Sequence, residues 1–169
     1  MDRQRRMRRV AILCCHFARN CAYYKASFDN NTTRATNEFW ATVQGNFIDI
    51  AVLEWLKLFG DHNDRHHWKN LVENKVLFKE AMLRNCSINE EEFLICRESF
   101  KRYRDKFVAH LDSEDIMHIP KLDDAISLVK YYYSYVVKEL KPSGLQALPQ
   151  DLNSYYQKCF VDSKLFFKG

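Results

Sequence analysis

Apolar residues recur every three or four positions along most of the chain, a spacing that places them on one face of an α-helix. Five or six segments show this spacing: about 3–28, 36–59 and 67–85, a fourth after Ser87, a fifth that Pro120 opens, and a short one at about 152–160. No convincing alternation of apolar and polar residues, the pattern of a half-buried β-strand, occurs in the sequence. We therefore predict an all-α fold, a bundle of five to six helices.

The later half of the second segment, about 47–59, is apolar on almost all sides. A helix of this kind is buried in the middle of a bundle or covered by a partner. With 169 residues, of which 47% are hydrophobic, the chain can form its own core, and only 4 Gly and 3 Pro argue against collagen-like or linker-rich structure. We expect a single domain over residues 1–169, with a basic arm at 1–9 and a C-terminal extension at 142–169.

Positive charge is concentrated at the N-terminus. The formal net charge is +4, and the first ten residues, with five Arg and one Asp, account for all of it. Any attraction to nucleic acid or an anionic membrane that arises from net charge therefore resides in this arm. The arm either binds RNA phosphates or serves only as a charged, solubilising terminus, and both interpretations stay open.

The six Cys show no C-x-x-C pair and fall mostly beside apolar residues, which is typical of reduced thiols in a cytoplasmic protein. Secretion is the minor alternative, because a basic stretch precedes the apolar run Val10–Ala18 as in a signal peptide. His16 interrupts this run and Arg19 follows it directly, which favours a folded helix. The run is also too short to span a bilayer, which takes about 20 residues, so no membrane partner is expected.

The fourth helical segment has the clearest end signals. Ser87-Ile88-Asn89-Glu90 fits a capping box, acidic residues occupy the first turn, and Lys and Arg occupy the last. Its apolar stripe consists of Phe93, Cys96, Phe100, Tyr103, Phe107 and Leu111. On regular α-helical geometry Arg104 and His110 lie on either side of this stripe. We therefore expect both at the rim of the helix contact.

Arg104 and His110 are a suitable pair for cleaving RNA without a metal ion. A guanidinium stays charged, and its planar fork fits a phosphate. An imidazole can take the proton of a ribose 2′-hydroxyl, whose oxygen then attacks the adjacent phosphorus and leaves a cyclic phosphate. One imidazole cannot serve both sides of the phosphorus, so a two-fold homodimer would supply the second pair. An ordinary basic helix end, with His110 as a partly buried cap, stays an alternative.

The segment Arg104–His110, late in a helix of an all-α chain, resembles the motif of the HEPN superfamily. Three further segments, Arg19–Tyr24, Asn46–Asp49 and Trp55–Gly60, are similar to its abortive-infection, AbiU-like branch. The resemblance covers most of residues 10–140. It implies a helical bundle, a homodimer and, in active members, a metal-independent endoribonuclease that acts on RNA in phage defence or as a toxin, with an antitoxin protein as a possible partner.

The resemblance also assigns roles to individual residues. It places the Arg of the motif at Arg104, the His at His110 and the polar position after the Arg at Asp105, and it implies no cofactor and no metal. A HEPN relative that carries a modified Tyr shortly after the His would need one at about position 113, where Ser113 stands. Some HEPN domains are not catalytic, so an inactive RNA- or protein-binding module is the alternative function.

Asp49 is the remaining candidate for the catalytic site. It lies on a polar strip with Thr42 and Asn46 in the otherwise apolar second segment. The carboxylate could orient Arg104 or His110 from a neighbouring helix, or the strip could simply face water. Both interpretations stay open.

Two other clusters have competing interpretations. The imidazoles between Asp61 and His67 could ligate a metal, but they cross a predicted loop, which favours a solvated loop with incidental His: His62, His66 and His67. Four tyrosines could stack on bases or fill the core: Tyr131, Tyr132, Tyr133 and Tyr135. No Gly-rich phosphate loop, Ser-His-Asp order or paired acid motif stands out, so a GTPase, a kinase and a hydrolase with a nucleophile elbow have no support.

Overall fold

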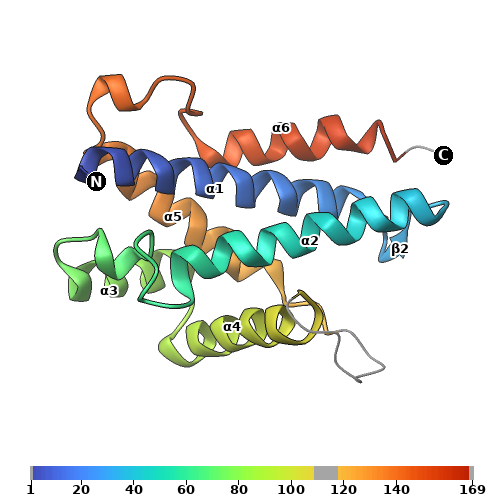
Figure 1. Cartoon of the computed structure of the whole chain (residues 1–169), viewed down its shortest axis with the longest axis horizontal. Coiled ribbons are helices and arrows are strands. Elements are labelled where there is room, and N and C mark those ends of the chain that lie inside the picture. Colours follow the sequence, from blue (N-terminus) through green and yellow to red (C-terminus); the bar gives the residue numbers. More distant parts are fainter. Residues whose placement is uncertain (1, 109–117, 168–169) are drawn as a thin grey trace.

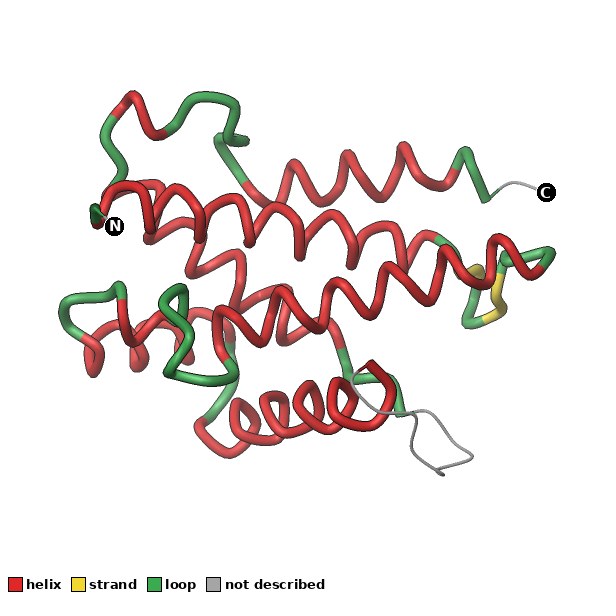
Figure 2. The backbone as a smooth tube through the Cα atoms, viewed as in Figure 1, coloured by secondary structure: helices red, strands yellow, loops and turns green. Residues whose placement is uncertain are grey.

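The computed structural model describes residues 2–108 and 118–167, and within these ranges the chain forms six α-helices (Figure 1). They are α1 (Arg3–Ala26), α2 (Glu38–Phe59), α3 (Lys75–Cys86), α4 (Glu90–Tyr103), α5 (Leu122–Glu139) and α6 (Leu152–Lys164). Figure 2 shows one small sheet beside them. The predicted all-α bundle is confirmed.

Helix α1 is the centre of the bundle. It packs against α2, α5 and α6, while α4 lies on the outer side of α2 and α3 packs against α5 (Figure 1). The apolar stripe predicted for the first helix is buried: Met7, Ala11, Cys14, Ala18 and Cys21. Because this stripe is buried against three neighbours, α1 joins α2, α5 and α6 into one core.

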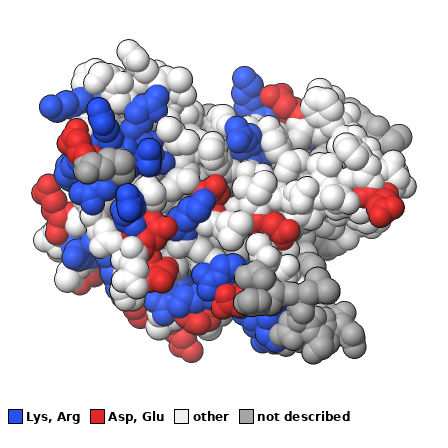
Figure 3. Space-filling model, viewed as in Figure 1, with Lys and Arg blue, Asp and Glu red and all other residues white. Residues whose placement is uncertain are grey.

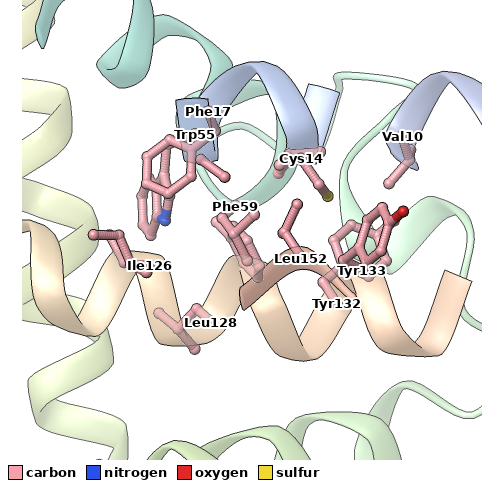
Figure 4. Close-up of a cluster of buried hydrophobic side chains, with 14 of the residues drawn as sticks. Val10, Cys14, Phe17, Trp55, Phe59, Ile126, Leu128, Tyr132, Tyr133 and Leu152 are labelled. Carbon is pink, nitrogen blue, oxygen red and sulfur yellow. The ribbon is translucent and has the colours of Figure 1, made fainter. Parts of the chain in front are cut away.

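Aromatic side chains from α2 and α5 fill the space beneath α1 (Figure 4). The rings of Trp55 and Phe59 lie 5.2 Å apart, and Phe59 meets Tyr132 edge-on at 5.8 Å. Tyr132 and Tyr133 are buried, so these two tyrosines are core residues, as one of the two interpretations predicted. Most apolar side chains in the later half of α2 are also buried, as predicted, whereas Phe47 is half-buried and Ile50 and Leu53 are exposed.

Both ends of the chain belong to the bundle. The residues expected to form a basic arm, Arg3–Arg9, form the first two turns of α1. The guanidinium of Arg3 lies 3.3 Å from a carboxylate oxygen of Glu73 and 3.6 Å from one of Glu139. At the other end, α6 buries apolar side chains against α1. Partners that are distant in sequence therefore hold both the basic segment and the C-terminal extension against the bundle.

A short hairpin, which the polar stretch after the first helix concealed, follows α1. Strand β1 (Phe28–Asp29) pairs antiparallel with β2 (Thr32–Thr33). Asn30 and Asn31 form the turn with φ of 46° and 66°, the left-handed conformation that asparagine tolerates better than most residues. The hairpin ends α1 at Ala26 and not at residue 28.

Asparagine caps define the starts of the third and fourth helices. Asn74 Oδ1 accepts from the N–H of Leu77 at 3.0 Å, so α3 begins at Lys75 and not near residue 67. Asn89 and Glu92 form a capping box, with bonds of 2.9 and 2.7 Å. Ser87 instead ends α3 in a left-handed conformation with φ 55°. The capping box predicted at Ser87 is therefore shifted by two residues.

All six cysteines are free, and five of them are buried. Cys86 is the one cysteine that is only half-buried, and burial still raises the pKa of its thiol to about 11. Burial raises the pKa of the Cys96 thiol to about 12. Thiols with such pKa values are protonated at neutral pH and pack as small apolar groups.

Candidate functional site

The apolar stripe of α4 docks this helix onto α2. Phe93, Cys96, Phe100 and Tyr103 are buried, as the sequence predicted. The rings of Phe100 and Trp55 lie 4.3 Å apart, and those of Phe93 and Phe59 lie 6.4 Å apart. The last residues of α4 are thereby held at a fixed place beside α2.

Beyond Tyr103 the backbone changes its winding. Arg104–Val108 form a π-helical turn, which has more residues per turn than an α-helix and recurs at functional sites. The prediction that Arg104 and His110 flank the apolar stripe assumes α-helical geometry through to His110, and the π turn does not follow that geometry. His110 itself lies outside the described residues. Phe107 keeps contact with the core, with its ring 5.6 Å from that of Tyr103.

Arg104 and Asp105 are neighbours in space as well as in sequence. Nε and Nη2 of Arg104 lie 2.7 and 2.6 Å from Oδ1 of Asp105. The side chains are 35% and 56% exposed, so the pair is open to solvent. An exposed pair of this kind contributes about 0–1 kcal/mol. A phosphate can therefore compete with Asp105 for the guanidinium.

Asp49 contacts the residue that precedes Arg104. The hydroxyl of Tyr103 donates to Asp49 Oδ1 at 2.8 Å. Burial raises the pKa of this hydroxyl, and the bond to Asp49 raises it further. Thr42 and Asn46 are exposed, as expected for a strip that faces water, whereas Asp49 is half-buried. Asp49 thus anchors the start of the π turn and has no bond to Arg104 among the described contacts.

A basic cleft of about 650 Å³ lies between α4 and the loop after α2. Its walls are the turn Gly60–His62 on one side and α4 with the π turn on the other. Five basic side chains line it: Arg97, Lys101, Arg102, Arg104 and Lys106. Three acidic ones accompany them: Asp61, Glu98 and Asp105. Figure 3 shows Lys and Arg side chains gathered on this part of the surface, interspersed with acidic ones.

Part of the positive charge in this cleft is already paired. Glu98 lies 3.2 Å from Arg97 and 3.7 Å from Lys101. Among the described residues that line the cleft, basic side chains outnumber acidic ones by five to three, and the partly exposed guanidinium of Arg104 can meet an incoming anion. It is large enough for more than one phosphate of a nucleic acid strand. The sequence alone did not place Arg97 or Lys101 in a site, although both follow the spacing of one helix face with Arg104, and it pointed to His62 only as a candidate metal ligand.

In the loop after α2, His66 and His67 each bind a neighbouring residue of the same loop. His67 is buried beside Trp68, and its Nδ1 accepts from the N–H of Lys69 at 3.2 Å. Burial lowers the pKa of His67 to about 4. Nδ1 of His66 lies 2.9 Å from Asp64 Oδ1. In the described ranges, no three His, Cys, Asp or Glu side chains gather in an arrangement that could hold a metal ion.

Neither a family model, nor a curated protein, nor a solved structure matches this chain. Among residues 2–108 and 118–167, no helix combines the length and apolar character needed to cross a bilayer.

Proposed function

We propose that this chain is a metal-independent endoribonuclease of the HEPN type, a cytoplasmic homodimer that acts in phage defence or as the toxin of a toxin–antitoxin pair. The observation that supports this most directly is the position of Arg104. Its guanidinium is partly exposed in a basic cleft, next to the polar residue of the motif. The motif continues to His110 in the sequence.

Arg104 would hold the scissile phosphate. A guanidinium forms two parallel charge-assisted bonds to phosphate oxygens and offsets the charge that grows on them in the transition state. Asp105 would orient this guanidinium through the contact to Nε and Nη2. Asp49 would act as a positioning residue, because it holds Tyr103 at the base of the π turn.

His110 would remove the proton of the ribose 2′-hydroxyl. The 2′-oxygen forms a bond to phosphorus, the bond from phosphorus to the 5′-oxygen breaks, and a second imidazole returns a proton to that leaving oxygen. The products are a 2′,3′-cyclic phosphate and a 5′-hydroxyl. The second imidazole would come from the other protomer of a two-fold dimer. The role of His110 rests on the sequence motif alone.

The proposal is tested by incubating the purified protein with a labelled single-stranded RNA and with tRNA in the presence of EDTA. We expect cleavage that leaves a cyclic phosphate, and a rate at least about 100-fold lower for Arg104→Ala and for His110→Ala. Arg84→Ala is the matched control, because Arg84 is an exposed arginine of α3 outside the cleft. Its rate should equal that of the wild type.

Cleavage that requires a metal, or that survives both substitutions, would contradict the proposal. RNA binding without any product, unchanged by His110→Ala, would instead identify the alternative, a catalytically inactive RNA-binding module. Light scattering of the purified protein tests the homodimer independently of activity.

A further inference from the structure

A second cavity, remote from the basic cleft, lies where the C-terminal ends of α1 and α6 meet the first turns of α2 (Figure 1). Its volume is about 240 Å³, below the roughly 300–1,000 Å³ of sites for drug-sized ligands. Five aromatic residues line it: Tyr23, Trp40, Phe47, Phe166 and Phe167. A cavity of this size can hold a small chemical group but not a whole drug-sized ligand.

The rings belong to two tilted pairs. Trp40 and Phe167 lie 5.3 Å apart with their planes at 59°, and Tyr23 and Phe47 lie 5.2 Å apart at 60°. Trp40, Phe47 and Tyr23 are each only partly buried, so part of each aromatic surface stays accessible.

Among the described residues that line this cavity, Asp162 of α6 is the one charged side chain, and it is exposed. The only other lining residue, Ser163, donates its hydroxyl to the carbonyl of Phe160 at 3.1 Å. Burial raises the pKa of the Tyr23 hydroxyl most, the nearby Arg19 guanidinium lowers it, and the Asp162 carboxylate makes a smaller contribution that raises it. The lining of this cavity combines five aromatic rings with one carboxylate.

We propose that this cavity binds the trimethylammonium group of a quaternary ammonium ligand. Ring faces attract a cation within about 6 Å of their centres, and the carboxylate adds to the attraction. A primary ammonium carries three N–H donors that need acceptors, and here one carboxylate is the only charged acceptor among the lining residues. A quaternary ammonium has no N–H to satisfy, so it fits these walls better.

Ligand binding in this cavity can be measured through the fluorescence of Trp40. Trp55 and Trp68 are almost fully buried, so a ligand in the cavity changes the fluorescence of Trp40 alone among the three tryptophans. We expect a saturable change on titration with choline at constant ionic strength, and a matching heat in calorimetry. The neutral isostere 3,3-dimethyl-1-butanol should bind at least about fivefold more weakly, because it lacks the charge. Equal affinity for the two compounds would overturn the proposal, as would the absence of both signals.

Substitutions locate the site. Asp162→Asn and Phe47→Leu should each weaken choline binding several-fold, the first by removing charge and the second by removing a ring while keeping apolar volume. Glu80→Gln, at an exposed acidic residue of α3 remote from the cavity, should leave binding unchanged. Unchanged binding by both cavity variants would also overturn the proposal.

The natural source of the ligand is distinguished with two peptides, one containing trimethyllysine and one containing lysine. Tighter binding of the trimethylated peptide than of choline indicates a modified protein as the source, and the reverse order indicates a small choline-like molecule. Equal binding of the two peptides would contradict the preference for a quaternary cation.

Discussion

The hydroxyl of Tyr103 donates a 2.8 Å hydrogen bond to Oδ1 of Asp49, which ties the last residue of α4 to the middle of α2. Tyr103 is buried and Asp49 is half-buried, so the bond is largely shielded from water. The π turn that carries Arg104 begins at the next residue. This contact, together with the aromatic packing of α4 on α2, holds the start of the π turn in place.

Removing this hydroxyl should destabilise the protein. Tyr103→Phe keeps the ring but leaves Asp49 without its donor, and a bond to a charged group contributes about 1.5–3 kcal/mol. We expect the free energy of unfolding, measured by urea titration, to fall by about 1–2 kcal/mol. Asp49→Asn, which keeps an acceptor oxygen, should cost less. An unchanged urea midpoint in Tyr103→Phe would show that the bond carries no stability.

Gly45, inside α2, and Gly60, directly after its last residue, should respond to alanine in opposite directions. At Gly45, inside the helix, an added Cβ meets no atom within 4 Å, so Gly45→Ala should stabilise the protein by about 0.5–1 kcal/mol. At Gly60 the added Cβ would lie 2.7 Å from the carbonyl oxygen of Leu56. Gly60→Ala should therefore cost about 1–3 kcal/mol. Thermal unfolding of both variants checks the pair, and a shift of the same sign in both would contradict the steric argument.

The helices could be predicted from sequence because each buries a stripe that local spacing reveals. Their starts were harder to predict. His67 and Asn74 both accept a backbone N–H, so each can begin a helical turn, and the sequence does not show that the turn at His67 ends after Asn70. The hairpin was missed because two-residue strands are too short for an alternating pattern.

The candidate site could be predicted only in part. Arg104 and Asp105 were found because they are adjacent in a recognisable motif. The opposite wall of the cleft, Gly60–His62, comes from a different part of the chain and meets α4 only through packing of Trp55 and Phe59. The partners of Arg3, Glu73 and Glu139, are likewise distant in sequence, so no local pattern predicts that the basic segment is held.

His67 should make stability depend on pH. Its pKa in the folded protein is lowered to about 4, mainly by burial, whereas an unfolded histidine titrates near 6.5. Between these values the unfolded state binds more protons, so stability is complete above about pH 6.5 and falls as pH decreases toward 4. The loss attributable to His67 should reach about 2–3 kcal/mol. Urea unfolding at pH 7 and pH 4.5 measures it.

Carboxyl groups also titrate in this pH range, so a substitution is needed to isolate the contribution of His67. His67→Gln keeps an acceptor for the N–H of Lys69 but cannot titrate, and it should lose less stability between pH 7 and pH 4.5 than the wild type does. His118→Gln, at an exposed histidine of the segment before α5, is the control and should follow the wild type. Identical losses in all three proteins would show that burial of His67 is not the source.

If the basic cleft binds RNA, its lysines should set the salt dependence of binding. Lys101 lines the cleft near Glu98, and its side chain is 33% exposed. Each phosphate contact to a single strand contributes about 0.7 to the slope of log affinity against log salt. Lys101→Ala should therefore weaken binding of a single-stranded RNA at low salt and reduce that slope by about 0.7. Lys158→Ala, at an exposed lysine of α6 outside the cleft, should leave the slope unchanged, and parallel slopes for Lys101→Ala and the wild type would place the RNA elsewhere.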